Sequence, residues 1–167
     1  MYKILNVQAS LFKSVAREIQ FRKAKKLSRT DAAYIAGLMD ADGCIQTGTK
    51  SPFYVRAKVT NNCLPVLHWL QQVTGVGQIV IIRNRAKPTH RMTYDWLVNS
   101  IGATEVLRQV VPFLKIKRGN AEAAIILQRM VKHKGRNWTD PVTDVEREER
   151  RKLAAIINDR TYGTVLN

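Results

Sequence analysis

The chain has 167 residues, which suits one domain or one domain with an appendage, and its 45% apolar residues provide for a core and exclude intrinsic disorder as the main description. Lys and Arg number 28 against 13 Asp and Glu, giving a net charge of +15. A field this positive favours a polyanionic partner, so we expect nucleic acid ahead of an anionic membrane surface.

The lengths of the apolar runs and the spacing of the cysteines indicate where in the cell the protein is located. No run reaches the roughly 18 apolar residues that a membrane span needs, so no membrane partner is expected. The two cysteines, Cys44 and Cys63, form no CxxC pair, which fits neither a zinc site nor a disulfide framework. These features predict an intracellular protein that is not secreted.

The first expected element is a basic amphipathic helix over residues 9–26. It could be a solvated helix, an arm that contacts DNA or an organellar transit peptide, and we favour an element near DNA. Next, the hydroxyl of Thr30 is suited to cap a short helix over about residues 31–41.

Apolar and polar residues alternate from residue 44 to residue 60, most clearly over 53–60. This period predicts two antiparallel strands with one buried face and one basic, solvated face. The remaining elements are expected to be a helix over 64–73, a second hairpin over 78–82 with 91–98, and helices over 102–111 and 117–132. A loop over 133–143 and a charged helix over 144–158 follow. The order predicts an α+β fold whose helices cover one sheet face and leave the other open.

Residues 35–43 read IAGLMDADG, which resembles the LAGLIDADG signature of homing endonucleases at seven of nine letters. The resemblance extends to the order of helices and strands, to Val59-Thr60 closing the second strand, and to the VPFLKIK stretch of residues 111–117 before a helix. It implies the LAGLIDADG homing endonuclease fold, αββαββα, with an antiparallel sheet that forms a saddle for DNA.

The resemblance covers residues 30 to about 132 and so divides the chain into three regions. Residues 1–29 form a basic N-terminal extension, residues 30–132 the endonuclease core, and residues 133–167 a C-terminal loop and helix expected to pack on the core.

Asp40 and Asp42 fall at the end of the motif helix, where the helix dipole disfavours anions by roughly 0.3–1 kcal/mol. Carboxylates at this place in a basic protein suit Mg²⁺, which takes one or two carboxylates, several waters and phosphate oxygens. The resemblance implies that Asp42 is the ligand of Mg²⁺ (or Mn²⁺), that Ala41 contributes its backbone carbonyl, and that Asp40 is structural.

The resemblance also implies two further catalytic residues. Lys117 matches the family's active-site lysine beside the scissile phosphate, and the alternative is a solvated lysine in a basic run. Asn61 falls where relatives often have a polar residue, frequently Gln, that orients water. Relatives often have a further basic residue shortly afterwards, but this chain has CLP at residues 63–65 and no clear match.

A single copy of the motif implies a C₂ homodimer, in which two motif helices cross at the axis and each Asp42 enters one of two adjacent active sites. Small side chains on the helix allow a second helix to approach closely. The residues expected at the interface are Ala33, Ala36, Gly37 and Asp40.

The implied activity is that of an intron-encoded homing endonuclease, located with the host genome, that hydrolyses both strands of a long pseudo-palindromic double-stranded DNA target with a divalent metal. Two alternatives stay open: a DNA-binding regulator of this fold without cleavage, and a maturase that binds intron RNA. Side chains on the open sheet face would read the major groove. The residues expected to contact DNA are Gln46, Lys50, Tyr54, Arg56, Lys58, Arg83, Arg85, Lys87 and Arg91.

Overall fold

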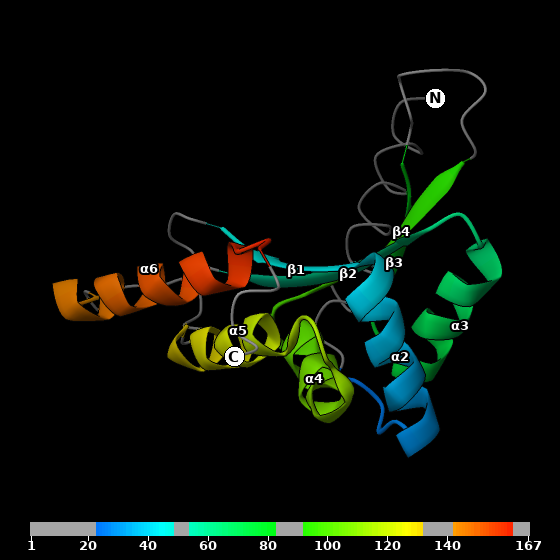
Figure 1. The fold of residues 1–167 in the computed structure, drawn as a ribbon, viewed down its shortest axis with the longest axis horizontal. Coiled ribbons are helices and arrows are strands. Elements are labelled where there is room, and N and C mark those ends of the chain that lie inside the picture. Colours follow the sequence, from blue (N-terminus) through cyan, green and yellow to red (C-terminus); the bar gives the residue numbers. More distant parts are fainter. Residues whose placement is uncertain (1–22, 49–53, 83–91, 132–141, 162–167) are drawn as a thin grey trace, which may run out of the picture.

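The computed structural model describes residues 23–48, 54–82, 92–131 and 142–161, and it confirms the expected α+β order of helices and hairpins. Figure 1 shows a sheet with helices gathered on one side. In chain order the elements are α2 (Arg29–Asp42), β1 (Gly43–Thr47), β2 (Val55–Asn61), α3 (Leu64–Thr74), β3 (Gln78–Ile82), β4 (Thr93–Asn99), α4 (Ser100–Val110), the short 3₁₀ helix η1 (Val111–Phe113), α5 (Arg118–Met130) and α6 (Asp144–Asn158).

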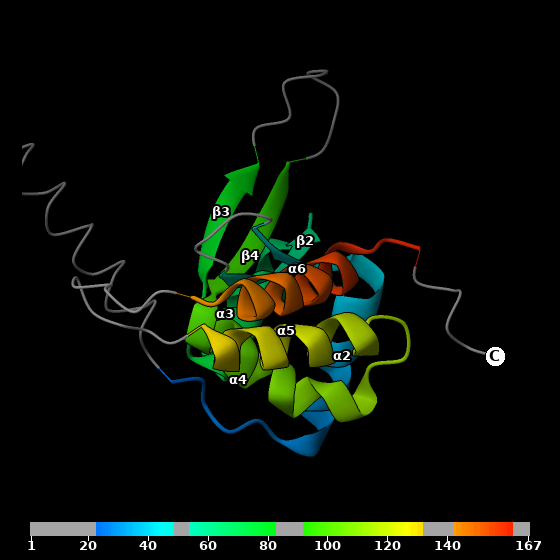
Figure 2. The same ribbon diagram turned by 90° about the vertical axis from the view of Figure 1, so that its left-hand side faces the viewer.

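The four strands form one antiparallel sheet in the order β1-β2-β4-β3. The period-two pattern of β2 is confirmed, because Val55, Ala57 and Val59 are fully buried under the helices while Arg56 and Lys58 point to the opposite face. In Figure 2, β3 and β4 rise beyond the helices. Within the described residues, the helices leave uncovered the sheet face that carries Arg56 and Lys58.

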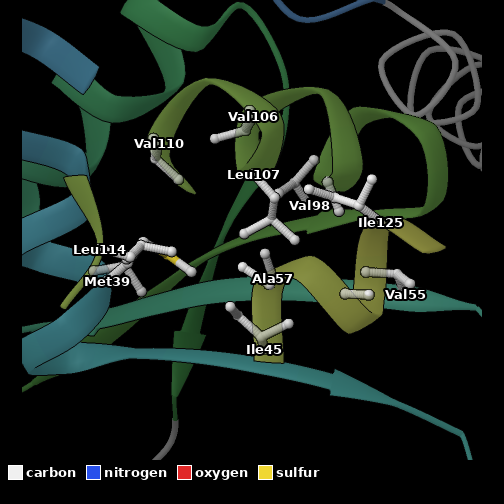
Figure 3. Packing of buried hydrophobic residues seen from close by; sticks show 14 of the residues in the cluster. Met39, Ile45, Val55, Ala57, Val98, Val106, Leu107, Val110, Leu114 and Ile125 are labelled. Carbon is white, nitrogen blue, oxygen red and sulfur yellow. The ribbon is translucent and has the colours of Figure 1, made fainter. Parts of the chain in front are cut away.

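The core lies between the covered sheet face and the helices (Figure 3). Ile45 and Ala57 from the sheet pack against Leu107 of α4, with Ile125 of α5 beside them, and Met39 of α2 lies next to Leu114. Burying each large aliphatic side chain contributes about 1.5–3 kcal/mol. This packing fixes where the C-terminal end of α2 lies relative to the start of α5.

Helix α2 begins at Arg29, two residues earlier than expected, because Ser28 rather than Thr30 is its cap. The Ser28 Oγ accepts a hydrogen bond from Asp31 N at 3.0 Å. The helix ends with Asp42, and a Cβ atom on its C-cap residue, Gly43, would lie 2.5 Å from the carbonyl oxygen of Met39. Glycine at this position lets the chain turn directly from α2 into β1.

Residues 23–28 run as an extended strap instead of the end of a helix, so the expected helix over 9–26 is wrong for its last four residues; the others lie outside the described residues. Glu105 Oε2 accepts from Ala24 N at 2.6 Å, and Gln109 Oε1 accepts from Leu27 N at 2.7 Å. Two side chains of α4 thus hold the strap through its backbone.

Helix α6 packs against α5 and lies beside β1, which is an edge strand of the sheet. The side-chain amide of Asn158 accepts from Thr47 N and donates to Thr47 O, both at 3.1 Å. The buried Arg150 donates to the carbonyl oxygen of Met130 at 2.8 Å. Within the described residues, no helix is both long enough and apolar enough to cross a membrane.

Candidate active site and nucleic-acid interface

Asp42 and Asn61, which were expected to share a site, are in direct contact. Asn61 Nδ2 donates to Asp42 Oδ2 at 2.9 Å, and Asn61 Oδ1 accepts from Cys63 N at 2.8 Å. The second bond turns the NH₂ group of Asn61 toward the carboxylate. The pairing of β1 with β2 explains the contact, because opposite neighbours Gly43 and Val59 bring the end of α2 to the end of β2.

Lys117 lies at the same end of α2, and the solvated alternative is wrong because the residue is only 4% exposed. Its Nζ donates to the carbonyl oxygens of Met39 at 2.9 Å and of Asp40 at 2.6 Å. These carbonyls are the negative end of the helix dipole, which favours a cation. Burial nevertheless lowers the pKa of Lys117, and it outweighs the opposing effect of the nearby Asp40 and Asp42.

Asp40 connects α2 to the segment before α5. Its Oδ2 accepts from the backbone N–H groups of Lys115 and Ile116 at 2.7 and 3.2 Å, and its Oδ1 accepts from Lys117 N at 3.0 Å. A carboxylate that receives three backbone N–H groups holds that segment in place. Asp40 therefore positions Lys117 next to Asp42.

The outward face of α2 carries small side chains. Ala33, Gly37 and Ala41 are exposed and recur every four residues, so they form one stripe. Ala36 is 0% exposed and packs in the core of its own chain, so the expectation that it lies at an interface does not fit its position. A Cβ atom on Gly37 would meet nothing within 4 Å, so the isolated chain does not require glycine there.

On the open sheet face, two basic side chains are held by partners across the strands. Arg56 Nε donates to Asn99 Oδ1 at 3.0 Å, and its guanidinium lies 5.5 Å from the centre of the Tyr54 ring. Lys58 forms an ion pair with Asp95 at 3.4 Å. These contacts orient both cations toward the open side of the sheet.

No family model matches the sequence, and no curated protein matches it significantly. Solved structures do match. The homing endonuclease I-CvuI, in complex with its target in the presence of calcium, aligns with a TM-score of 0.58 and 21% identity over 80% of this chain and 85% of that chain. The homing endonuclease I-TnaI aligns with a TM-score of 0.53 and 18% identity, over 83% of this chain and 92% of its own.

The LAGLIDADG meganuclease I-AabMI, bound to uncleaved DNA, aligns with a TM-score of 0.59 and 14% identity over 76% of this chain and 44% of that chain. This chain has the LAGLIDADG homing endonuclease fold. In terms of that fold, the IAGLMDADG segment forms the second half of α2 and the turn into β1, so the motif ends at the contact between Asp42 and Asn61.

Two residues that position cations on the open sheet face, Asp95 and Asn99, were not predicted from the sequence. Asp95 and Asn99 hold Lys58 and Arg56, and the alternation of residues 93–99 was the signal that could have placed them on the open face. The register also places the side chains of Gln78, Val80 and Ile82 on this face, opposite Leu97, Asp95 and Thr93. Five of the residues expected to contact DNA lie outside the described residues: Lys50, Arg83, Arg85, Lys87 and Arg91.

Proposed function

We propose that this chain is a homing endonuclease of the LAGLIDADG family, which makes a site-specific double-strand cut in DNA by metal-dependent hydrolysis. The observation that carries the proposal is the meeting of Asp42, Asn61 and Lys117 at one end of α2, next to an open sheet face with oriented cations. A net charge of +15 supports DNA as the polyanion bound there.

The active form is a homodimer built on the outward face of α2. Because Ala33, Gly37 and Ala41 have small side chains, a second α2 helix can pack closely on this face. This packing would explain the glycine at residue 37, which no contact within one chain requires. Asp40 acts at this interface indirectly, by fixing the end of α2. Two copies then place two Asp42 carboxylates near the axis, one for each DNA strand, and the target is long and pseudo-palindromic.

The residues at the end of α2 fit Mg²⁺ or Mn²⁺. Asp42 is exposed, and the Ala41 carbonyl belongs to the last turn of the helix, where carbonyls lack partners within the helix. The described residues hold no group of three His, Cys, Asp or Glu side chains able to bind a metal, so phosphate oxygens and waters must complete the shell, as Mg²⁺ prefers. When bound, the metal would activate water and stabilise charge on the phosphate.

The protein side chains have separate roles in this reaction. Asn61 directs its amide toward the Asp42 carboxylate and orients the attacking water through the same group. Lys117, fixed by two carbonyls, places a positive charge beside the phosphate and stabilises the charge that develops on it.

The open sheet face reads the target. Gln46, Arg56 and Lys58 lie on it, and Tyr54 supports the Arg56 guanidinium, whose remaining nitrogens can bind guanine bidentately. The basic residues of 49–53 and 83–91 remain proposed DNA contacts. We also propose that the gene lies in an intron and that the protein acts in the compartment that holds the host genome.

The proposal is tested by cutting a randomised plasmid library with the full chain and Mg²⁺, followed by single-turnover cleavage of the recovered duplex. Asp42→Asn keeps the side-chain size and removes the charge, so cleavage should fall by several orders of magnitude while the gel-shift Kd stays equal or becomes slightly tighter. Wild-type-like cutting by this variant would contradict the assignment of Asp42. DNA binding without any cutting by the wild type would support a regulator, and preferential binding of structured RNA would support a maturase.

A further inference from the structure

The three residues after α6 are fastened beside the start of α5. Asn120, in the first turn of α5, donates to the carbonyl oxygens of Ile156 and Asp159 at 2.8 and 3.1 Å. Thr161 donates from its backbone N and its hydroxyl to Asp159 Oδ1, at 2.9 and 2.7 Å. Arg160 therefore stands between two anchored neighbours, and it is exposed.

This anchoring brings the charge of Arg160 to the candidate active site. Lys117 immediately precedes α5, one helical turn before Asn120. The bonds from Asn120 thus hold the residue before Arg160 beside the start of α5, and the positive charge of Arg160 contributes, after burial, to lowering the pKa of Lys117. In Figures 1 and 2, the C-terminal end of α6 is the end directed toward α2.

The negative charge at the end of α2 would repel phosphate groups, and a cation such as Arg160 can offset it. Asp40, Asp42 and the helix dipole concentrate negative charge where phosphates must approach. The ammonium of Lys117 is buried and bonded to two carbonyls, so part of its charge is balanced within the chain. An exposed guanidinium can bind a phosphate with two parallel N–H groups.

We propose that Arg160, on the segment after α6, is a phosphate-binding residue of the cleavage centre, and that its guanidinium binds the backbone at the phosphate that is cut or at its neighbour. This role rests on the proposed nuclease function. It extends the active site beyond residues 30–132 to the C-terminal region, and it assigns α6 the task of delivering a catalytic charge.

The test compares Arg160→Gln with Arg151→Gln in the full-length chain on the recovered target duplex. Arg151 is a matched control because it is an exposed arginine of α6, paired at 3.6 Å with Glu148, and its loss changes the net charge equally. Arg160→Gln should slow single-turnover cleavage at saturating enzyme by about 10–100-fold, while the Kd measured in Ca²⁺ changes by less than about threefold. Arg151→Gln should match the wild type in both, and Arg160→Lys should recover part of the rate.

Equal cleavage rates for both glutamine variants would overturn the inference, and so would a loss confined to the Kd, which would place Arg160 on a phosphate away from the cut. Thermal unfolding of Arg160→Gln, measured beside that of Arg151→Gln, separates a loss of folding from a loss of cleavage rate. Failure of the wild type to cut any target would overturn the proposed function and this role with it. That result differs from normal cutting by Arg160→Gln, which overturns this role alone.

Discussion

Replacing Asp40 with asparagine tests how strongly the end of α2 is tied to the segment before α5. In the wild type, one carboxylate oxygen serves Lys115 and Ile116 and the other serves Lys117, all through backbone N–H groups. Asparagine retains one oxygen, which can keep a pair of bonds without the charge, and it presents an NH₂ group to the remaining N–H. One bond is therefore lost and two are weakened.

The expected cost follows from these three bonds. Losing one hydrogen bond to a charged group costs about 1.5–3 kcal/mol, and weakening the other two costs about 0.5–1 kcal/mol each. Removing an anion from the negative end of a helix returns about 0.3–1 kcal/mol. The free energy of unfolding should fall by about 1.5–4.7 kcal/mol, and the Tm by roughly 3–19 °C for a chain of this size.

Urea unfolding followed by circular dichroism measures this loss, and Asp42→Asn is the matched control. The same chemical change two residues later affects an exposed carboxylate bonded to one side chain, so stability should change by less than about 1 kcal/mol. Below the unfolding transition, Asp40→Asn should cleave within about tenfold of the wild type, whereas cleavage by Asp42→Asn should be slower by several orders of magnitude. An Asp40→Asn protein as stable as the wild type, or a control that loses as much, would refute the assigned roles.

Two more substitutions test Lys117 and Gly37. Lys117→Met should slow cleavage by about 10²–10³-fold. Burial holds the pKa of Lys117 below its ordinary value of 10.5, so the unfolded chain binds that proton more tightly than the folded chain. The stability of the wild type should therefore rise relative to that of Lys117→Met as the pH increases toward 10.5. Urea midpoints of the two proteins that run parallel over this range would contradict the burial argument. Gly37→Leu should convert the dimer to a monomer, as measured by sedimentation. Gly119→Leu is the control, because a Cβ atom there also meets nothing within 4 Å, and this variant should remain dimeric. A dimeric Gly37→Leu protein would count against packing of two α2 helices.

The sequence predicted those parts of the fold that depend on local periodicity. The alternation over 53–60 identified β2 and its two faces, and the motif placed Asp40 and Asp42 at the C-terminal end of a helix, which is α2. The resemblance assigned Asp42 and Asn61 to one site, and the antiparallel register of β1 and β2 explains their direct contact, which was not predicted.

Other features depend on partners far away in the chain. The strap of residues 23–28 has helical composition, but Glu105 and Gln109 offer acceptors to its backbone that no local pattern reveals. Lys117 sits in a basic run, and its bonds to the carbonyl oxygens of Met39 and Asp40, far earlier in the chain, hold it in a buried position. The apolar residues of β3 show no alternation, so the pairing with β4 alone decides which of them face the open side.

Asn158 affects whether molecules of this protein aggregate through the edge of the sheet. β1 is an edge strand, and an unpaired edge invites strand-to-strand pairing between molecules and hence aggregation. The Asn158 amide offers one acceptor and one donor to Thr47, so it occupies the positions that a foreign strand would take. A chain that ended before residue 158 would expose this edge, and the C-terminal helix therefore also protects the protein from self-association through its sheet.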